Sequence, residues 1–235
     1  DSPQWMSDRL PAVEELASFA GTLFGSDMVR RGASDAARER IQRILDERAY
    51  HPVFQPVVTA DTHEVVGYEA LTRFDDGTRP DLCFAEAHAV GMGIELEVAC
   101  ATAALAEASS LPHDQWVSVN LSPAAVLSGT AAAPLHAPGR RIIVEITEHE
   151  PIESYPDLRA AIDACGGCEI SVDDAGAGYA SLRHILELQP DVVKLDIALV
   201  RDIDADPARQ ALAAGLCHFA SQTGTTLIAE GVETE

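Results

Sequence analysis

Six polar residues stand in or directly after short runs rich in valine and isoleucine, and they supply carboxylate, amide and ammonium groups. They are Glu69, Asn120, Glu145, Asp173, Lys194 and Glu230. Oxygen ligands, with no His or Cys in the series, favour a hard cation such as Mg²⁺ or Mn²⁺ over zinc. Asp174 follows Asp173 directly, so this pair could bridge two ions and serve a two-metal hydrolysis of a phosphodiester.

The residue two positions before each of these groups lies on the same face of its strand, because strand side chains alternate. These residues are Gly67, Ser118, Ile143, Ser171, Val192 and Ile228. The face that these residues share therefore carries small or apolar side chains along the strands and polar side chains at their carboxyl ends. In a closed barrel this face points inward, and the carboxyl ends of the strands meet at one mouth, where active sites of that architecture lie. Several carboxylates buried together there require raised pKa values or divalent cations.

A single acidic residue at a strand end has a simpler explanation. It is more often a helix cap or a solvated charge at the rim of a domain. Six polar residues in register on six strands are hard to explain in that way, so their repetition favours a site.

The elements that would position these residues follow a βα rhythm from Tyr50 onward, which is typical of a parallel sheet and here of a TIM-like (β/α)8 barrel in the α/β class. The expected strands cover residues 53–58, 65–71, 116–120, 142–146, 169–173, 192–195 and 226–229. The expected helices cover residues 83–90, 94–109, 155–164, 180–187 and 207–223.

The segment before the barrel has a different pattern. Residues 12–31 and 34–48 are expected to form helices, with Ser34 as the cap of the second and Ile41, Ile44 and Leu45 as its apolar stripe. We therefore divide the chain into residues 1–49, a helical linker or dimerisation segment, and residues 50–235, the catalytic-size domain.

Composition excludes several classes of partner. The chain has 235 residues, of which 47% are hydrophobic, and its mean hydropathy is +0.02, which suits one large α/β domain. Against 38 Asp and Glu it has 16 Lys and Arg, and the formal charge of −22 argues against DNA, RNA polymers and anionic membranes as partners. No apolar run reaches the ~18 residues of a membrane span, and the polar start differs from a signal peptide. A cytoplasmic location with five reduced cysteines is expected.

At these residues the sequence resembles the EAL family of cyclic di-GMP phosphodiesterases over about residues 50–235. The matching segments are Phe54-Gln55-Pro56, Glu69-Ala70-Leu71-Thr72-Arg73, Asn120-Leu121-Ser122, Glu145-Ile146-Thr147-Glu148, Asp173-Asp174-Ala175-Gly176-Ala177-Gly178-Tyr179, Lys194-Leu195-Asp196 and Ala229-Glu230-Gly231-Val232-Glu233. The tripeptide Glu-Ala-Leu is weak alone, but the ordered set at barrel spacing is specific.

The resemblance implies a role for each matched residue. It implies two bound Mg²⁺ or Mn²⁺ ions, with Glu69, Asn120, Glu145 and Asp173 around one and Asp173, Asp174 and Glu230 around the other. Lys194 would hold the attacking water, Glu230 would be a candidate general base, and Glu69 joins them in the catalytic set. Gln55, Arg73 and Asp196 would contact the substrate, and Glu148 and Glu233 would stabilise loops. For Arg73, a rim ion pair is an equal alternative to a bidentate phosphate contact, and Lys194 could also be a buried partner of the carboxylates.

The sequence departs from the family pattern in two places. Ala175 stands where the family usually has Phe, and Ala177 where it commonly has a hydroxyl residue, so the loop that follows is expected to be less firmly anchored. The family also continues with another helix and an eighth strand, whereas this sequence stops at Glu235. The domain is therefore expected to be C-terminally incomplete, with two unpaired sheet edges.

Three functions compete. The first is metal-dependent hydrolysis of cyclic di-GMP to linear pGpG, which the intact ligand positions favour. The second is a domain that binds cyclic di-GMP or a protein partner without turnover, which Ala175 and Ala177 favour. The third, a sugar or metabolite enzyme on the same barrel, lacks the glycine loops or paired acids it would need. A homodimer and an upstream sensor domain are expected from the amino-terminal helices.

Overall fold

The strands form one curled sheet. The computed structural model describes residues 31–136, 139–146, 152–175 and 179–232. Its seven-stranded sheet has the order β1-β2-β3-β4-β5-β6-β7. The strands are β1 (Tyr50–Val58), β2 (Val65–Phe74), β3 (Trp116–Leu121), β4 (Ile142–Ile146), β5 (Glu169–Ala175), β6 (Val192–Leu195) and β7 (Thr226–Ala229). The strand positions predicted from the sequence are confirmed, and the arrangement is that of a partial TIM-like barrel.

The first two strands differ from the expected parallel pattern. β1 and β2 are antiparallel, with Gln55 opposite Glu69 and Tyr50 opposite Phe74, whereas every later pair is parallel. Residues 59–64 between them are too few for a crossover helix, so the chain turns back as a hairpin. This pairing extends β1 and β2 beyond their predicted ends. In the described residues no strand pairs with the outer edge of β1 or of β7.

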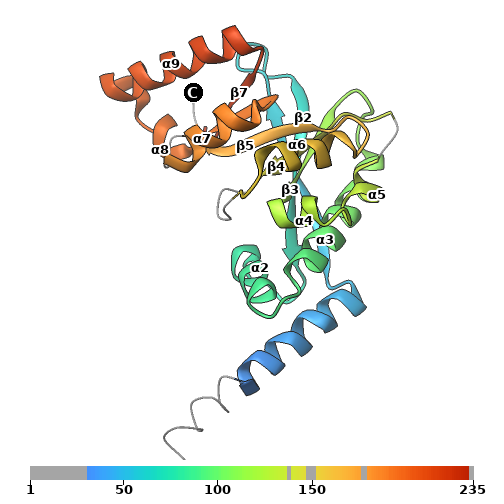
Figure 1. Ribbon diagram of the computed structural model, residues 1–235. Helices are drawn as coiled ribbons and strands as arrows, with labels where there is room; N and C mark the ends of the chain where they lie inside the picture. The colour runs from blue at the N-terminus through green and yellow to red at the C-terminus, as the bar shows by residue number, and fades with distance from the viewer. Residues whose placement is uncertain (1–30, 137–138, 147–151, 176–178, 233–235) are drawn as a thin grey trace, which may run out of the picture.

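Helices connect the parallel strands and cover the outside of the sheet (Figure 1). They are α2 (Pro80–Ala89), α3 (Gly93–Glu107), α4 (Pro123–Leu127), α5 (Ala132–Leu135), α6 (Tyr155–Asp163), α7 (Tyr179–Leu188), α8 (Ile197–Val200) and α9 (Pro207–Thr223), with the short 3-10 helices η1 (Ala108–Ser110) and η2 (Ile203–Ala205). The five helices predicted between strands are confirmed. Side-chain caps fix several of their starts, as Ser122 does for α4 and Asp206 for α9.

A separate helix precedes the barrel and packs against α2 and α3. Residues 31–47 are helical without interruption, so the prediction that Ser34 caps this helix is wrong: the turn formed by residues 31–33 already belongs to it. The predicted apolar stripe is confirmed, because Ile41 and Ile44 are buried with Leu96 and the partly buried Leu45 packs beside them. The predicted helix over residues 12–31 lies, but for its last residue, outside the described part of the chain.

The core has two main parts. The larger part lies between the outer face of the sheet and helices α3 to α9, and the smaller lies under the helix of residues 31–47. A third cluster fills the barrel below the strand ends, where Trp116, Ile143 and Val192 are buried. Trp116 lies so close to Gly67 that a Cβ there would come within 2.1 Å of the indole, so this position requires glycine.

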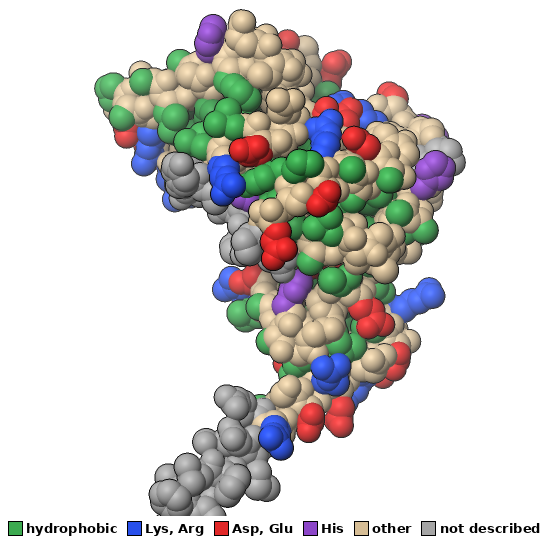
Figure 2. Space-filling model, viewed as in Figure 1, with side chains coloured by type: hydrophobic (Ala, Val, Ile, Leu, Met, Phe, Trp, Pro, Cys, Tyr) green, Lys and Arg blue, Asp and Glu red, His purple; other side chains and the backbone are tan. Residues whose placement is uncertain are grey.

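The surface shows mixed charges and one apolar area. Figure 2 shows hydrophobic side chains gathered near α7 and α9, and Leu182, Leu186 and Leu212 of these helices are exposed. In the described residues, no helix is both long and apolar enough to cross a membrane.

Candidate active site

The parallel strands bring the six predicted polar residues to one end of the barrel. The register sets Asn120 beside Glu145 across β3 and β4, and Asn120 donates from Nδ2 to Glu69 at 3.4 Å. Lys194 comes up from β6, where its neighbours on both sides are buried apolar residues. Glu230 follows β7 directly, and its backbone N–H donates to the carbonyl oxygen of Leu195. Sheet register therefore assembles a cluster from residues that are far apart in sequence.

Lys194 lies at the centre of this cluster. Its ammonium nitrogen contacts four carboxylates: Glu69 at 3.3 Å, Glu145 at 3.0 Å, Asp173 at 3.3 Å and Glu230 at 2.7 Å. The side chains of Lys194 and Glu145 are 4% and 3% exposed, whereas Glu230 is 26% exposed. The cluster is therefore closed below and opens to solvent on the side of Glu230.

Burial and charge act against each other in this cluster. Burial raises the pKa of Glu145 to about 7, while the neighbouring Lys194 ammonium opposes this rise. Burial also raises the pKa of Glu230, again against Lys194. For Lys194 itself, burial lowers the pKa but the carboxylates, led by Glu145, outweigh it, so the pKa is raised and the group stays an ammonium. When all four carboxylates are ionised, the four carboxylates and the one ammonium carry a net charge of −3.

The donor chemistry of this cluster fits a hard divalent cation. Its groups are carboxylate and amide oxygens, and its excess negative charge is what such cations offset. In the described part of the chain, however, no three acidic, His or Cys side chains are placed close enough together to hold an ion. Lys194 lies between the carboxylates instead and makes the contacts that a cation would otherwise make. The side chain of Asp174 lies outside the described set.

The predicted substrate residues lie at the edge of this cluster. Gln55 is exposed on β1 directly opposite Glu69, which puts both side chains on the same face. Arg73 lies on that face four residues after Glu69, is exposed, and donates from Nη1 to the carbonyl oxygen of Thr72 at 2.9 Å. Asp196 caps α8 through a 2.7 Å bond from the Ala198 N–H.

The remaining predictions fall partly outside the described residues. Glu148 and Glu233 lie there, as do residues 176–178 of the loop after β5. Ala175, where the sequence departs from the expected aromatic residue, ends β5 fully buried in the core. Its carbonyl oxygen accepts a 3.3 Å hydrogen bond from the Asp196 N–H.

A cavity of about 480 Å³ adjoins the cluster and was not predicted from the sequence. It lies between the ends of β2 and β3 and helices α2 and α3, and its wall includes Arg73, Phe84, Asn120 and Cys100. Most of the lining is apolar, with a small polar group at one side. A cavity of this size and character suits a flat aromatic ring with a polar edge.

One of the polar residues in the cavity wall is Glu97. This residue is buried, accepts from the Ser122 N–H at 2.8 Å, and lies 2.5 Å from His88 Nε2. Gly93 makes room for His88, because a Cβ at Gly93 would come within 2.3 Å of the imidazole. Sequence reasoning missed Glu97. The signal that could have found it is a glutamate on the same helical stripe as Leu96 and Cys100, which are core positions.

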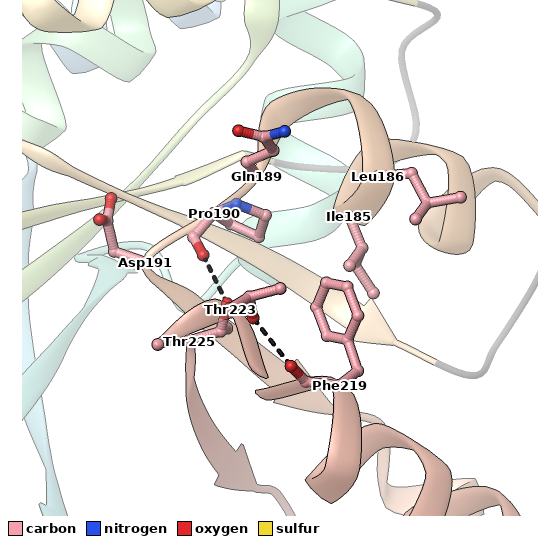
Figure 3. Close-up of a pocket in the computed structure, with 9 residues that line it drawn as sticks. Ile185, Leu186, Gln189, Pro190, Asp191, Phe219, Thr223 and Thr225 are labelled. Atoms are coloured by element: carbon pink, nitrogen blue, oxygen red, sulfur yellow. Dashed lines mark hydrogen bonds between the residues drawn. The ribbon is translucent and has the colours of Figure 1, made fainter. Parts of the chain in front are cut away.

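A second cavity, of about 360 Å³, lies at the opposite end of the strands between α7 and α9. Figure 3 shows its hydroxyls satisfied within the fold: Thr223 donates to Phe219 and Thr225 donates to Pro190. Asp191 at its edge accepts from the Ile170 N–H. These groups serve the turns that lead into β6 and β7.

The fold and the cluster define a class of barrel protein with an acidic mouth built around a buried lysine. Comparison with known proteins places it more narrowly: residues 38–235 match the EAL domain. The chain belongs to the EAL domain family.

Three relatives illustrate the range of that family. The chain is 26% identical over 214 residues to the cyclic di-GMP phosphodiesterase PdeL of Escherichia coli, covering 84% of this chain and 59% of PdeL. It is 26% identical over 208 residues to the blue light- and temperature-regulated antirepressor BluF of the same organism, covering 81% of this chain and 49% of BluF. BlrP1 of Klebsiella pneumoniae, solved with cyclic di-GMP and manganese at pH 6, is 31% identical with a TM-score of 0.69, over 79% of this chain and 50% of BlrP1. BlrP1 has also been solved with calcium and cyclic di-GMP. The chain thus spans about half of each of these relatives.

Proposed function

We propose that this domain hydrolyses cyclic di-GMP to linear pGpG with the help of two divalent cations, Mg²⁺ or Mn²⁺. The observation that carries the proposal is the set of carboxylates around Lys194, open on one side and adjoining the apolar cavity. PdeL, which is named for this activity, and BlrP1, which was solved with manganese and the dinucleotide, support it.

The ligands follow from the donor groups of the cluster. Glu69, Asn120, Glu145 and Asp173 would hold one cation, and Asp173, Asp174 and Glu230 would hold the second. When bound, the cations would lower the pKa of a water molecule and offset the charge of the phosphate. To bind the cations, the carboxylates would have to turn away from Lys194. A small rotation of their side chains would be enough for this.

Several residues would act on the reacting atoms. Lys194, a permanent ammonium among carboxylates, would hold the attacking water by donating hydrogen bonds to its oxygen. Glu230, the most exposed of the four carboxylates and one with a raised pKa, would accept the proton of that water. The water oxygen would form a bond to one phosphorus while the bond from that phosphorus to the ribose 3′ oxygen breaks. The leaving oxygen would take up a proton from solvent and become the 3′ hydroxyl of pGpG, while the 5′ phosphate keeps the new oxygen.

Other residues would orient the dinucleotide. Arg73 is exposed at the mouth and would form a bidentate contact with a phosphate. Gln55 and Asp196 lie at the same edge and would contact the sugar or phosphate. One guanine would enter the 480 Å³ cavity, where Glu97 presents an acceptor for the N–H groups of its edge. Glu148 and Glu233 would stabilise loops, Glu148 the one after β5.

The domain would work within a larger, dimeric protein. The chain spans about half of its relatives, and the helix of residues 31–47 leads directly into β1, so residues 1–49 would connect an upstream sensor to a catalytic domain of residues 50–235. The exposed Leu182 and Leu186 of α7 offer an apolar surface for a second copy. A cytoplasmic location would suit this substrate.

A second candidate function is binding of cyclic di-GMP without turnover. Ala175 favours it, because an alanine buried at the end of β5 lacks the aromatic side chain expected to anchor the next loop. BluF, named as an antirepressor, is a relative whose name states regulation instead of hydrolysis.

Product analysis separates the two functions. The purified protein is incubated with cyclic di-GMP and Mn²⁺, and pGpG is followed by chromatography, with Glu69→Gln as the matched variant. We expect pGpG from the wild type and none from Glu69→Gln. Ca²⁺ in place of Mn²⁺ should allow binding while slowing turnover, because the larger ion relaxes the ligand geometry. Metal-dependent binding without product would support the binding function.

A further inference from the structure

Two serine hydroxyls lie inside the barrel directly below the carboxylate cluster. Ser118 and Ser171 have no exposed surface, and within the described residues neither hydroxyl meets the distance and angle of a full hydrogen bond. Ser118 nevertheless lies close enough to Glu145 for its hydroxyl to lower the pKa of that carboxyl. Ser171 is the register neighbour of Glu145 on β5, and Ser118 lies on β3 two residues before Asn120, which is the neighbour of Glu145 on the other side. The two hydroxyls therefore approach Glu145 from both adjacent strands.

Packing alone does not explain these hydroxyls. A buried hydroxyl without a hydrogen bond is less favourable than a methyl group of similar size, so alanine would suit a purely apolar interior better. Below the serines the barrel is filled by Trp116, Ile143 and Val192, whose side chains offer no acceptor. The polar groups nearest in register on this inner face belong to the carboxylate cluster, because Glu69 is the neighbour of Ser118 and Glu145 is the neighbour of Ser171. Of the two carboxyls, Glu145 is the one whose pKa the Ser118 hydroxyl lowers.

Glu145 is the member of the cluster that most needs a fixed position. Its carboxylate is buried, and Oε2 contacts Lys194 at 3.0 Å. The hydroxyls of the two serines are donors of the kind that the other oxygen, Oε1, can accept. Carboxylates that bind metals are commonly oriented by such outer hydrogen bonds, and their loss weakens metal binding.

We propose that Ser118 and Ser171 are positioning residues that bind the Glu145 carboxylate from inside the barrel, by direct donation or through one buried water. They hold one carboxylate oxygen below so that the other faces Lys194 and the open mouth. The metal-related part of this inference rests on the proposed function, whereas the contact to Glu145 does not.

The test combines a structure with a binding measurement. Crystal structures of the metal-free wild type and of the double variant Ser118→Ala/Ser171→Ala show where Glu145 lies. We expect each wild-type hydroxyl to contact the carboxylate directly or through a water, and the carboxylate to shift in the variant. Absence of these contacts, or an unmoved carboxylate in the variant, would overturn the proposal.

Mn²⁺ titration by calorimetry supplies the second readout, with Ser221→Ala on the surface of α9 as the control. The double variant should bind Mn²⁺ about tenfold more weakly at an unchanged or higher melting temperature. Unchanged Mn²⁺ affinity in the folded variant contradicts the positioning role. Should the wild type bind no Mn²⁺, the proposed function fails, and the crystal contacts still decide the inference about Glu145.

Discussion

The ammonium nitrogen of Lys194 lies 3.0 Å from Oε2 of Glu145, and both side chains are almost fully buried. An ion pair out of water is stabilising only if every charge keeps a partner, since removal of one partner leaves the other buried and unpaired. Three more carboxylates share the same ammonium. Lys194 is therefore the group on which the metal-free cluster depends.

Replacement of this lysine should make the fold depend on metal. Lys194→Met leaves Glu145 without its cation, so the metal-free variant should lose about 3 kcal/mol in the free energy of unfolding. Mn²⁺ should raise the melting temperature of the variant more than that of the wild type, because the added cation offsets the charge. Hydrolysis should be lost in both conditions.

Thermal unfolding with and without Mn²⁺ measures this effect, and Arg43→Met, at an exposed position of the preceding helix, serves as the control. Equal stability of Lys194→Met and wild type in EDTA would show that the cluster does not need the ammonium.

The raised pKa of Glu145 predicts a pH dependence for the metal-free protein. The carboxyl has a pKa of about 7 in the fold against an ordinary value near 4.5, so between these values the folded state binds more protons than the unfolded state. Its contribution to stability is therefore present below pH 4.5 and is lost as the pH rises to about 7, by on the order of 3 kcal/mol.

Urea unfolding of wild type and Glu145→Gln in EDTA, at several values between pH 4.5 and 8, tests this pH dependence. The variant is the reference because glutamine does not titrate. The stability of wild type relative to Glu145→Gln should fall as the pH rises. Parallel curves for the two proteins would mean that folding does not raise the pKa of Glu145.

Some of these features follow from the sequence and others do not. Strands β4, β6 and β7 have their predicted bounds, because continuous β-branched runs bounded by turns leave little choice. The six polar residues meet because they share one inward face, which the alternation of strands already indicates. The antiparallel start of the sheet depends instead on how few residues join β1 to β2.

Contacts that depend on how helices pack against the sheet could not be predicted from the alternation of side chains along a strand. Glu97 belongs to a helix, and its place beside Ser122 depends on how α3 rotates against the sheet. The place of Lys194 among four carboxylates likewise depends on the stagger of the strands, which alternation alone does not give. Ser34 has the residue type of a cap, yet the helix begins before it.

Glu97 should matter for ligand binding more than for folding. Glu97→Gln keeps an oxygen for the Ser122 N–H but loses the carboxylate that pairs with His88 and that would accept from a guanine edge, so cyclic di-GMP should bind about tenfold more weakly. Calorimetry with cyclic di-GMP and Ca²⁺ measures the affinity without turnover. Glu95→Gln, an exposed glutamate of the same helix, is the matched control. Equal affinities of the two variants for cyclic di-GMP would mean that the guanine does not bind beside Glu97.

The helix of residues 31–47 should contribute to the stability of the barrel to which it is attached. Ile41 is fully buried beside Leu96 and Cys100, so Ile41→Ala should lower the free energy of unfolding by about 3 kcal/mol. Arg40 joins the same helix to the barrel through Asp76 and Thr78, each at 2.8 Å, and through Glu86. These ion pairs are partly exposed, so Arg40→Ala should cost less, about 1 kcal/mol.

Urea unfolding of both variants, with Arg43→Ala as an exposed control on the same helix, measures the two contributions. If the helix were merely tethered, all three variants would unfold at the same urea concentration. If the helix is docked as the structure shows, the Ile41→Ala variant unfolds at the lowest urea concentration. Cys100 belongs both to the cluster around Ile41 and to the wall of the 480 Å³ cavity, so Ile41→Ala should also weaken binding of cyclic di-GMP.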